Sequence, residues 1–566
     1  MNGYAEGVNA NAAIYLDPEA YRTSGALLMG RHSAGESFLR GFLRHGAVAR
    51  FRLWNVAGRP TEELEALVTE LHRPDRPVDY ISQRMRQNLA DPGVVQLTGP
   101  FVGREAWQRR PFGEARYSIC GLTHTTSSAE IQRDIAELVL GPTQPHDALI
   151  CTSAAVRSAV ETQMAAVGDY LAFQFGPRRK PTPQLATIPL GINTSDFSRT
   201  DAQRKSWRAR LNIADDDFVA LYVGRFSLMG KMNPAVMALA LERAAQITER
   251  KIVWVLSGWA EDPEAEVGYH DGARALCPSV RYVVVDGRPA DTRFSIWSAA
   301  DAFISLSDNV QETFGLTPLE AMAAGLPSVV TDWDGYRETV RDNIDGFRIP
   351  TWAPRSGFGA ELAHRYANGW LPYPYFVGAA SQFTAVEIGR AAEAIAALVR
   401  HPNIGRQMGE AAQIRARSEF DWSVIIPRYQ DLWADLGARR RVATPREWPA
   451  DLPDNPWMMD PFRLFASYPT HHLQPASRLS PQPGMNAASA LARLRTPHAA
   501  YYLTGFPTPD EVAAVVELLT RRGAMTVAEL LAEMPEARRF HLERGLLWLA
   551  KFGVIAVSPA LPGETG

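Results

Sequence analysis

The first 190 residues alternate short apolar runs with amphipathic stretches. Apolar runs that predict strands lie at residues 26–29, 48–54, 94–97, 117–120 and 148–152. Apolar residues at helical spacing lie between them, for example at 36–44, 62–71 and 130–140. Buried strands that alternate with helices predict a parallel sheet flanked by helices.

The same alternation returns after a junction near residues 184–197. Five further runs predict strands, at 218–223, 252–256, 280–285, 302–305 and 328–331. Helical patterns separate them, and more helix is expected at 387–400, 406–420 and 424–436. The pattern therefore predicts two doubly wound α/β domains, at residues 1–190 and 191–436.

Residues 351–383 interrupt this alternation with a segment rich in aromatic side chains. They include Trp352, Phe358, Tyr366, Trp370, Tyr373, Tyr375 and Phe376. Two uses are open, because aromatic faces can stack on an acceptor sugar ring or pack against other parts of the chain. Packing against the proline-rich residues 437–507 is the favoured interpretation.

The remaining residues predict a strap and a small domain. Prolines prevent regular structure over much of residues 437–507. Because Trp448 and Trp457 need burial, this segment is expected to run as a strap across a neighbouring surface. Two capping boxes, Thr508–Glu511 and Thr526–Glu529, begin a unit at 508–566. Its helix–helix–helix–strand order predicts a winged-helix-like domain.

Composition is ordinary for a globular protein, with 46% hydrophobic and 21% charged residues and a net charge of −3. Without a basic excess, nucleic acid is not indicated as a partner. Three cysteines cannot form a disulfide framework, which favours a reducing, cytoplasmic compartment. The chain begins without a signal-peptide pattern, and no apolar run reaches the roughly 18–20 residues of a membrane span.

The segment Gln311-Glu-Thr-Phe-Gly-Leu-Thr-Pro-Leu-Glu320 follows an expected strand, at the sheet edge where open α/β sheets bind ligands. Thr317 and Pro318 fit the N-cap and first positions of a helix, and Glu320 fits the third. The amides of residues 314–316 then lie beside a helix start, which attracts anions. Glu320 has two open roles, in a capping box or as a ligand for hydroxyl groups.

A second loop carries two cations, Arg225 and Lys231, after the first expected strand of the second domain. Such a pair is commonly a solvated surface. Beside a helix start, however, it suits a diphosphate, because both charges neutralise it and arginine donates two parallel hydrogen bonds.

Together these residues resemble the retaining family-4 glycosyltransferases, the glycosyl transferases group 1, which have the GT-B fold of two Rossmann-like domains. The matching features are Val223-Gly-Arg225 with Lys231, the Glu312/Glu320 pair, and Gly-Leu-Pro-Ser-Val-Val-Thr at 325–331. Residues 188–193 are similar to the family's interdomain stretch, with Asn193 where the family usually has Asp. The resemblance covers about residues 185–350.

The resemblance implies a nucleotide-diphosphate sugar as donor and no metal or other cofactor. Arg225 and Lys231 would hold the diphosphate. Glu312 would bind hydroxyls of the sugar, and Glu320 those of the ribose. Main-chain contacts to the donor are implied at Gly224, Phe314, Gly315, Leu316 and Thr317.

The first domain matches the family less closely. Gly30-Arg-His-Ser-Ala-Gly35 stands where the family has a glycine-rich loop near the donor phosphate, so Gly30 and Gly35 are candidate donor contacts. His124 follows an expected strand, where the family often has a histidine against the donor sugar. His32 competes for that role, and a purely structural role for His124 stays open.

The resemblance predicts a retaining, metal-independent hexosyltransferase that acts on a saccharide, lipid-linked or protein acceptor. The resemblance implies that the acceptor hydroxyl attacks the donor sugar on its front face. A phosphate oxygen of the donor assists this attack, so no protein general base is named. Two alternatives stay open: a nucleotide-sugar epimerase of related fold, and a non-catalytic sugar-nucleotide-binding protein that acts through its C-terminal module.

Other charged features favour ordinary interpretations. Asp332-Trp-Asp334 would hold a metal in another glycosyltransferase fold, and here it is expected to be a plain loop. Residues 508–558 are near neutral, which disfavours nucleic acid although three arginines cluster on the third helix. A protein partner or dimer stays open for that unit. The basic runs 178–180 and 439–441 leave open a peripheral contact with the inner face of a membrane.

Overall fold

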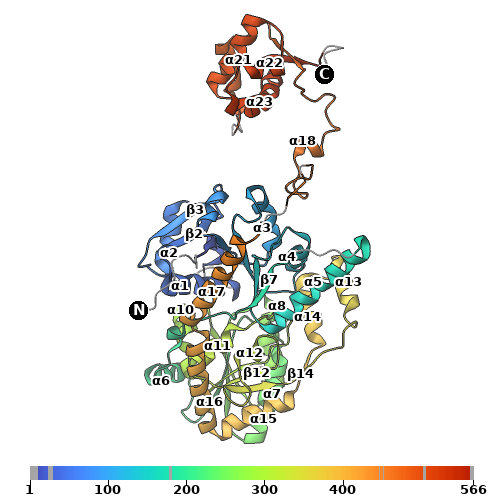
Figure 1. The fold of residues 1–566 in the computed structure, drawn as a ribbon. Coiled ribbons are helices and arrows are strands. Elements are labelled where there is room, and N and C mark those ends of the chain that lie inside the picture. The colour runs from blue at the N-terminus through green and yellow to red at the C-terminus, as the bar shows by residue number, and fades with distance from the viewer. Residues whose placement is uncertain are drawn as a thin grey trace. The chain divides into compact units, whose positions relative to one another are not determined.

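The computed structural model in Figure 1 describes residues 11–22, 30–176, 182–444, 447–449, 451–500 and 505–560. The chain forms two units, Met1–Asn455 and Pro456–Gly566. The first unit contains two parallel α/β sheets, of seven and six strands. This confirms the prediction of two doubly wound Rossmann-like domains, the architecture of the GT-B fold.

The first sheet has the strand order β3-β2-β1-β4-β5-β6-β7, and its neighbouring strands are parallel. Its strands are β1 (Ala13–Leu16), β2 (Phe51–Asn55), β3 (Val78–Ser82), β4 (Val94–Gln96), β5 (Ser118–Leu122), β6 (Ala148–Cys151) and β7 (Gln184–Thr187). The strand order reverses between β1 and β4. A ligand crevice is therefore expected beyond the carboxyl ends of these two strands.

The start of the first domain differs from the sequence prediction. The first strand of the sheet is β1, whereas the predicted run 26–29 lies outside the described residues. Gly30 begins helix α1 (Gly30–His45), so the predicted glycine-rich loop is wrong and Gly30 to Gly35 are helical. Gly35 allows a close approach instead, because a Cβ there would lie 2.3 Å from the carbonyl oxygen of Ala20.

The second sheet has the order β10-β9-β8-β11-β12-β13, again with parallel neighbours. Its strands are β8 (Phe218–Val223), β9 (Ile252–Gly258), β10 (Arg281–Asp286), β11 (Ala302–Ser305), β12 (Ser328–Thr331) and β13 (Gly346–Ile349). The order reverses between β8 and β11. The loops that follow these two strands carry Arg225, Lys231 and Glu312.

Helices flank both sheets. Those of the first domain are α1, α2 (Thr61–Leu71), α3 (Val102–Arg109), α4 (Ala129–Leu140) and α5 (Ala154–Phe175). Those of the second are α6 (Asp201–Arg210), α7 (Pro234–Thr248), α8 (Pro263–Val267), α9 (Ala273–Leu276), α10 (Ala290–Ser295), α11 (Leu316–Ala323), α12 (Tyr336–Thr339), α15 (Ile388–Arg400) and α16 (Pro402–Arg415). None of the described helices combines the length and apolar character needed to cross a membrane.

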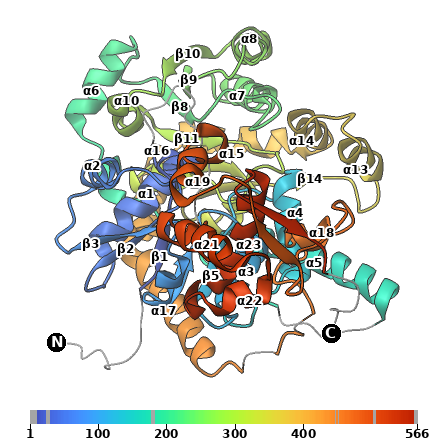
Figure 2. The same cartoon turned by 90° about the horizontal axis from the view of Figure 1, so that it is seen from above.

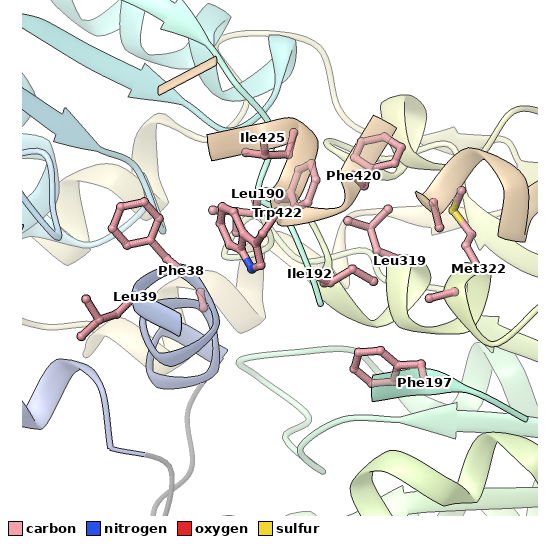
Figure 3. Close-up of a cluster of buried hydrophobic side chains, with 14 of the residues drawn as sticks. Phe38, Leu39, Leu190, Ile192, Phe197, Leu319, Met322, Phe420, Trp422 and Ile425 are labelled. Atoms are coloured by element: carbon pink, nitrogen blue, oxygen red, sulfur yellow. The ribbon is translucent and has the colours of Figure 1, made fainter. Parts of the chain in front are cut away.

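The two α/β domains share one buried core at the segments that connect them (Figure 3). Trp422 begins α17 (Trp422–Arg441) and lies between Gly41 and Gly191, where a Cβ would come within 2.4 and 2.7 Å of its indole. Its indole N–H donates to the Ser37 hydroxyl at 2.7 Å, and Phe38 meets it edge-on. Figure 3 shows the cluster continuing through Phe420, Phe197, Leu319 and Met322. Helix α17, predicted as part of the second domain, thus packs on the first.

The aromatic segment 351–383 folds as an insertion in the second domain. Strands β14 (Thr351–Trp352) and β15 (Ala385–Val386) pair antiparallel and enclose helices α13 (Ala360–Ala367) and α14 (Tyr373–Gln382). Figures 1 and 2 both show these two helices beside α4 of the first domain.

The predicted packing partner of the insertion, residues 437–507, is divided between the two units. In the described strap residues of the first unit, Trp448 packs on Trp107 and on the Arg110 guanidinium, which belong to the first domain. Several aromatic side chains of the insertion are instead more than half exposed, namely Trp352, Phe358, Trp370, Tyr375 and Phe383. Trp448 therefore packs on the first domain rather than on the insertion, and packing of the insertion against the rest of the strap stays a prediction.

The second unit contains a three-stranded antiparallel sheet in the order β17-β16-β18. Its strands are β16 (Arg478–Pro481), β17 (Met525–Thr526) and β18 (Ile555–Ser558). Its helices are α18 (Pro461–Leu464), α19 (Ala487–Leu494), α20 (Pro497–Ala500), α21 (Pro509–Arg522), α22 (Val527–Ala532) and α23 (Arg539–Lys551). Both predicted capping boxes are present. The unit begins earlier than the predicted residue 508, because β16 and α19 contribute to its sheet and core despite nearby prolines.

Candidate functional site

The predicted cations and acid meet at the switch point of the second sheet. The cation loop, residues 224–231, follows β8, and the acid loop, residues 306–315, follows β11. Because these strands are neighbours, their loops emerge side by side. The Lys231 ammonium lies 3.4 Å from a carboxylate oxygen of Glu312. Two loops about 80 residues apart in sequence therefore form one site.

Hydrogen bonds fix the two loops against each other. The side-chain amide of Asn309 donates to the carbonyl oxygen of Met229 at 2.6 Å, and its oxygen accepts from the backbone N–H of Gln311 at 2.9 Å. Within the cation loop, the Gly230 amide donates to the Ser227 hydroxyl at 3.1 Å. The backbone that presents Lys231 and Glu312 is therefore held before any ligand arrives.

Arg225 lies mostly buried at the start of the cation loop, with its side chain 14% exposed. Burial lowers the pKa of its guanidinium, while neighbouring Tyr222 and Glu312 act in the opposite direction. Arg225 also forms an ion pair with Glu261, which lies in the loop after β9. Sequence reasoning missed Glu261, because a lone acid in a loop carries no motif.

The Glu312 carboxylate is held in its ionised form. Burial raises the pKa of Glu312, but Lys231 and the backbone amides of Thr313 and Phe314 together lower it below its ordinary value. The Thr313 amide donates to the carboxylate at 3.3 Å. An ionised carboxylate accepts hydrogen bonds and donates none, which suits sugar hydroxyls.

Helix α11 does not begin as predicted, so the proposed capping box of Glu320 is wrong. The N-cap is Gly315, which has no side chain to cap the helix, and Thr317 lies inside the first turn. Gly315 has φ = 84°, and a Cβ there would lie 2.1 Å from the ring of Tyr336. The carboxylate of Glu320 is thus not used as a cap. Burial raises its pKa to about 7, with Arg293 opposing the rise.

The start of α11 lies directly beyond Glu312. Phe314 is buried, and the backbone then passes through Gly315 into Leu316, the first helical residue. The amides of a first helical turn have no carbonyl partner within the helix and favour negative charge. The residues with implied main-chain contacts, 314–317, therefore lie at the start of α11.

The predicted histidine of the first domain reaches the same place. His124 follows β5, and its carbonyl oxygen accepts from the Thr313 hydroxyl at 2.7 Å. His32, Gly35 and His124 all line one cavity of about 260 Å³ at the carboxyl ends of β1 and β4. Both candidate histidines therefore line this crevice. Gly30 is the first described residue of α1, so it lies in a helix rather than in the predicted loop.

The two domains touch directly across the site. The Thr152 hydroxyl donates to the carbonyl oxygen of Thr313 at 3.4 Å. The Ser153 hydroxyl, which also caps α5, donates to Asp334 at 2.8 Å. Burial raises the pKa of Asp334 to about 7. Asp334 therefore takes part in an interdomain contact that the sequence did not indicate.

The two acids of Asp332-Trp-Asp334 have different partners. Asp332 lies 3.6 Å from both Arg337 and Arg348, whereas Asp334 bonds to Ser153. Across the part of the chain that the structure describes, no group of three or more acid, histidine or cysteine side chains gathers as a metal site.

The arginines predicted to cluster on the third helix of the second unit hold that unit together. Arg538 forms an ion pair with Glu511 at 2.7 Å. Arg539 donates to the carbonyl oxygen of Met534, and Arg544 to that of Gly505. These three arginines therefore have partners within their own unit.

The basic runs are only partly described. Residues 178–180 lie outside the described residues. At the end of α17, Arg439 pairs with Asp435 at 2.7 Å, and Arg440 donates to the carbonyl oxygens of Ala115 and Arg116. The second run is therefore engaged within the first unit.

Comparison with known proteins places the site within a family. Residues 203–355 match the family model described as glycosyl transferases group 1. A D-inositol 3-phosphate glycosyltransferase of Nocardioides sp. is 30% identical over 177 residues, 29% of this chain and 37% of that protein. A protein of the same name from Streptomyces griseus is 26% identical over 262 residues, 45% of this chain and 47% of that protein. The chain thus spans less than half the length of these curated relatives.

Solved structures that are similar to this chain include Anabaena Alr3699/HepE in complex with UDP. It is 16% identical, has a TM-score of 0.49, and the match covers 75% of this chain and all of that one. Residues 203–355, which match the model of the glycosyl transferases group 1, carry Arg225, Lys231, Glu312 and Glu320.

Proposed function

We propose that the protein is a glycosyltransferase that moves a sugar from a nucleotide-diphosphate sugar to an acceptor hydroxyl, with retention of configuration. The observation that carries the proposal is the convergence of Arg225, Lys231 and Glu312 with the start of α11 at one switch point. The family match of residues 203–355 supports the same activity.

The cations act on the leaving group. As the bond between the sugar C1 and the diphosphate oxygen breaks, negative charge grows on the diphosphate. Arg225, Lys231 and the amides at the start of α11 would stabilise that charge in a largely buried site, where such contacts are strongest. Because the cation loop is already hydrogen-bonded to the acid loop, little reorganisation is needed.

The acids orient the donor. Glu312, ionised beside Lys231, would accept hydrogen bonds from sugar hydroxyls, and Glu320 would accept them from the ribose. Main-chain groups at Gly224, Phe314, Gly315, Leu316 and Thr317 would complete this side. His124, with Gly30 at the start of α1, would contact the donor from the first domain.

The acceptor would bind on the first domain and attack C1 on the face that the diphosphate leaves. Its hydroxyl proton would pass to a phosphate oxygen of the leaving diphosphate, so no protein general base is assigned. The charge that a metal would neutralise falls here on Arg225 and Lys231, and we therefore propose a metal-independent reaction. Domain closure excludes water from the reacting bond.

The test uses the full chain with a panel of nucleotide-diphosphate sugars. A thermal-shift screen first selects the donor, because a ligand at 100 times its Kd stabilises by about 2.7 kcal/mol. Acceptors are then screened, beginning with inositol and an inositol phosphate because of the relatives' name, and the product's anomeric configuration is read by NMR. Release of nucleoside diphosphate with an α-linked product from an α-linked donor is expected. An inverted product, or an epimerised donor formed without any acceptor, would overturn the proposal.

A further inference from the structure

Helix α14 of the insertion contacts the acid loop of the candidate site. The Tyr373 hydroxyl donates to the side-chain oxygen of Gln311 at 3.2 Å. The Ser381 hydroxyl, at the other end of the helix, donates to the buried Asp308 carboxylate at 2.9 Å. The helix is thereby fixed to the acid loop at two points, one of them next to Glu312.

The same insertion reaches the first domain. The Tyr373 hydroxyl lies 2.9 Å from that of Ser127, and the Tyr366 hydroxyl accepts from the backbone N–H of Ala129 at 2.8 Å. Ala129 is the first residue of α4, so this N–H has no partner within its own helix. Tyr366 stacks on Phe376 with centroids 4.4 Å apart, which joins α13 to α14. Figures 1 and 2 show both helices beside α4.

One hydroxyl therefore connects the two sides of the cleft. Ser127 lies three residues after His124, and Gln311 immediately precedes Glu312. The Tyr373 hydroxyl bonds to both Ser127 and Gln311. Tyr375 on the same helix is 54% exposed and offers a matched comparison for Tyr373.

We propose that Tyr373 is a positioning residue, and that it and Tyr366 make residues 351–383 a clasp that holds the cleft closed over the donor. The inference rests on the proposed glycosyltransferase activity and adds a structural element to it. The clasp sets the distance between the loop of His124 and the acid loop, without touching the reacting atoms.

We expect the clasp to affect the ratio between transfer of the donor sugar to the acceptor and hydrolysis of the donor by water. In transfer, the acceptor oxygen bonds to C1, the bond from C1 to the diphosphate oxygen breaks, and the acceptor proton goes to the diphosphate. In hydrolysis, water supplies the oxygen and the proton, and free sugar is formed. A cleft that opens more often admits water and loses acceptor alignment, so the ratio of hydrolysis to transfer rises.

The test compares Tyr373→Phe with Tyr375→Phe in the full chain. Each variant loses one hydroxyl from α14, but the exposed Tyr375 has no bridging contact among the described residues. We expect the hydrolysis-to-transfer ratio to rise about fivefold in Tyr373→Phe, the effect of one lost hydrogen bond, and to stay unchanged in Tyr375→Phe. The melting temperature of both should stay within about 2 °C of wild type.

A double-mutant cycle with Ser127→Ala identifies the bond itself. Ser127→Ala should reproduce the effect of Tyr373→Phe, and the double variant should add little to either. A wild-type ratio in Tyr373→Phe, from an enzyme that does transfer sugar, would overturn the clasp and leave the proposed function standing. If the wild-type chain neither transfers nor hydrolyses any donor that binds it, the proposed function is overturned and the clasp with it.

Discussion

Glu320→Gln separates a ligand role of Glu320 from a structural one. The substitution keeps the size of the side chain but removes its charge. Since α11 is capped at Gly315 without any side chain, the helix start should be unaffected. The carboxylate lies on α11, the helix that begins beyond Glu312, and we expect its neutralisation to change stability and nucleotide binding in opposite directions.

The sign and size of the stability effect follow from the pKa. Burial raises the pKa of Glu320 from 4.5 to about 7, so the folded protein holds a proton that the unfolded chain releases. This contribution to stability is complete below about pH 4.5 and is lost as the pH rises through about 7. The rise corresponds to on the order of 3 kcal/mol. Glu320→Gln carries no such dependence, so it should melt like wild type at pH 5 and above wild type at pH 8.

Nucleotide binding should respond in the opposite way. Ribose hydroxyls donate to the ionised carboxylate, so wild type should bind a nucleoside diphosphate more tightly as the pH rises from 6 to 8. Glu320→Gln should lack this gain and bind more weakly at pH 8. The affinity of wild type is divided by that of Glu320→Gln at each pH. Protonation of the nucleotide affects both proteins alike, as does protonation of Asp334, whose pKa is also raised by burial to about 7, so neither changes this ratio.

Calorimetric titration and thermal melts at pH 5, 6, 7 and 8 provide the measurements. Glu410→Gln, an exposed acid on α16, serves as the matched control and should follow wild type in both. An affinity ratio that does not change with pH would refute the ribose role. A lower melting temperature of Glu320→Gln at pH 8 would show that the carboxylate is structural.

Other substitutions test the rest of the site and the core. Lys231→Ala and Arg225→Ala should each lower kcat/KM roughly 30- to 1000-fold, which corresponds to a loss of about 2–4 kcal/mol of transition-state stabilisation. Lys205→Ala, at an exposed residue, should leave kcat/KM unchanged. Near-normal turnover of either site variant would contradict the assignment of Arg225 and Lys231 to the diphosphate. Transfer should survive EDTA, and a loss that Mn²⁺ or Mg²⁺ restores would contradict the metal-independent reaction. Trp422→Ala should lower the free energy of unfolding by about 3–5 kcal/mol, whereas Trp370→Ala, 66% exposed, should melt like wild type.

Most strands of the two sheets could be predicted because they are short apolar runs, whereas β1 and β3 of the first sheet were missed. Central parallel strands such as β5, β6 and β9 are buried along their whole length, and this leaves a clear signal in sequence. The resemblance then identified Arg225, Lys231 and Glu312, and the neighbouring β8 and β11 explain why these residues meet. Spacing along the chain could not have shown this, because it does not say which strands are neighbours.

The start of helix α11 was predicted wrongly, because it depends on a residue outside the local sequence. Thr317, Pro318 and Glu320 fit a capping box, yet α11 begins at Leu316. Tyr336 packs so close to Gly315 that only a residue without a Cβ fits at position 315. Gly315, with its positive φ, is the N-cap, so the helix starts two residues before the predicted position. The contact spans 21 residues, so no short window could reveal it. Gly35 was misread for the same reason, because its partner Ala20 lies outside α1.

The contacts of Tyr373 show what remains beyond sequence reasoning. The aromatic content of residues 351–383 indicated either sugar stacking or burial, since both use the ring. The structure assigns the decisive contacts to the hydroxyl, which bonds to Ser127, 246 positions away, and to Gln311, 62 positions away. A tyrosine with such partners cannot be distinguished in sequence from the exposed Tyr375 on the same helix. The proposed role of Tyr373 depends on the domain arrangement, which brings the loops after β5 and β11 together. The function proposed for the insertion therefore depends on residues that lie outside it.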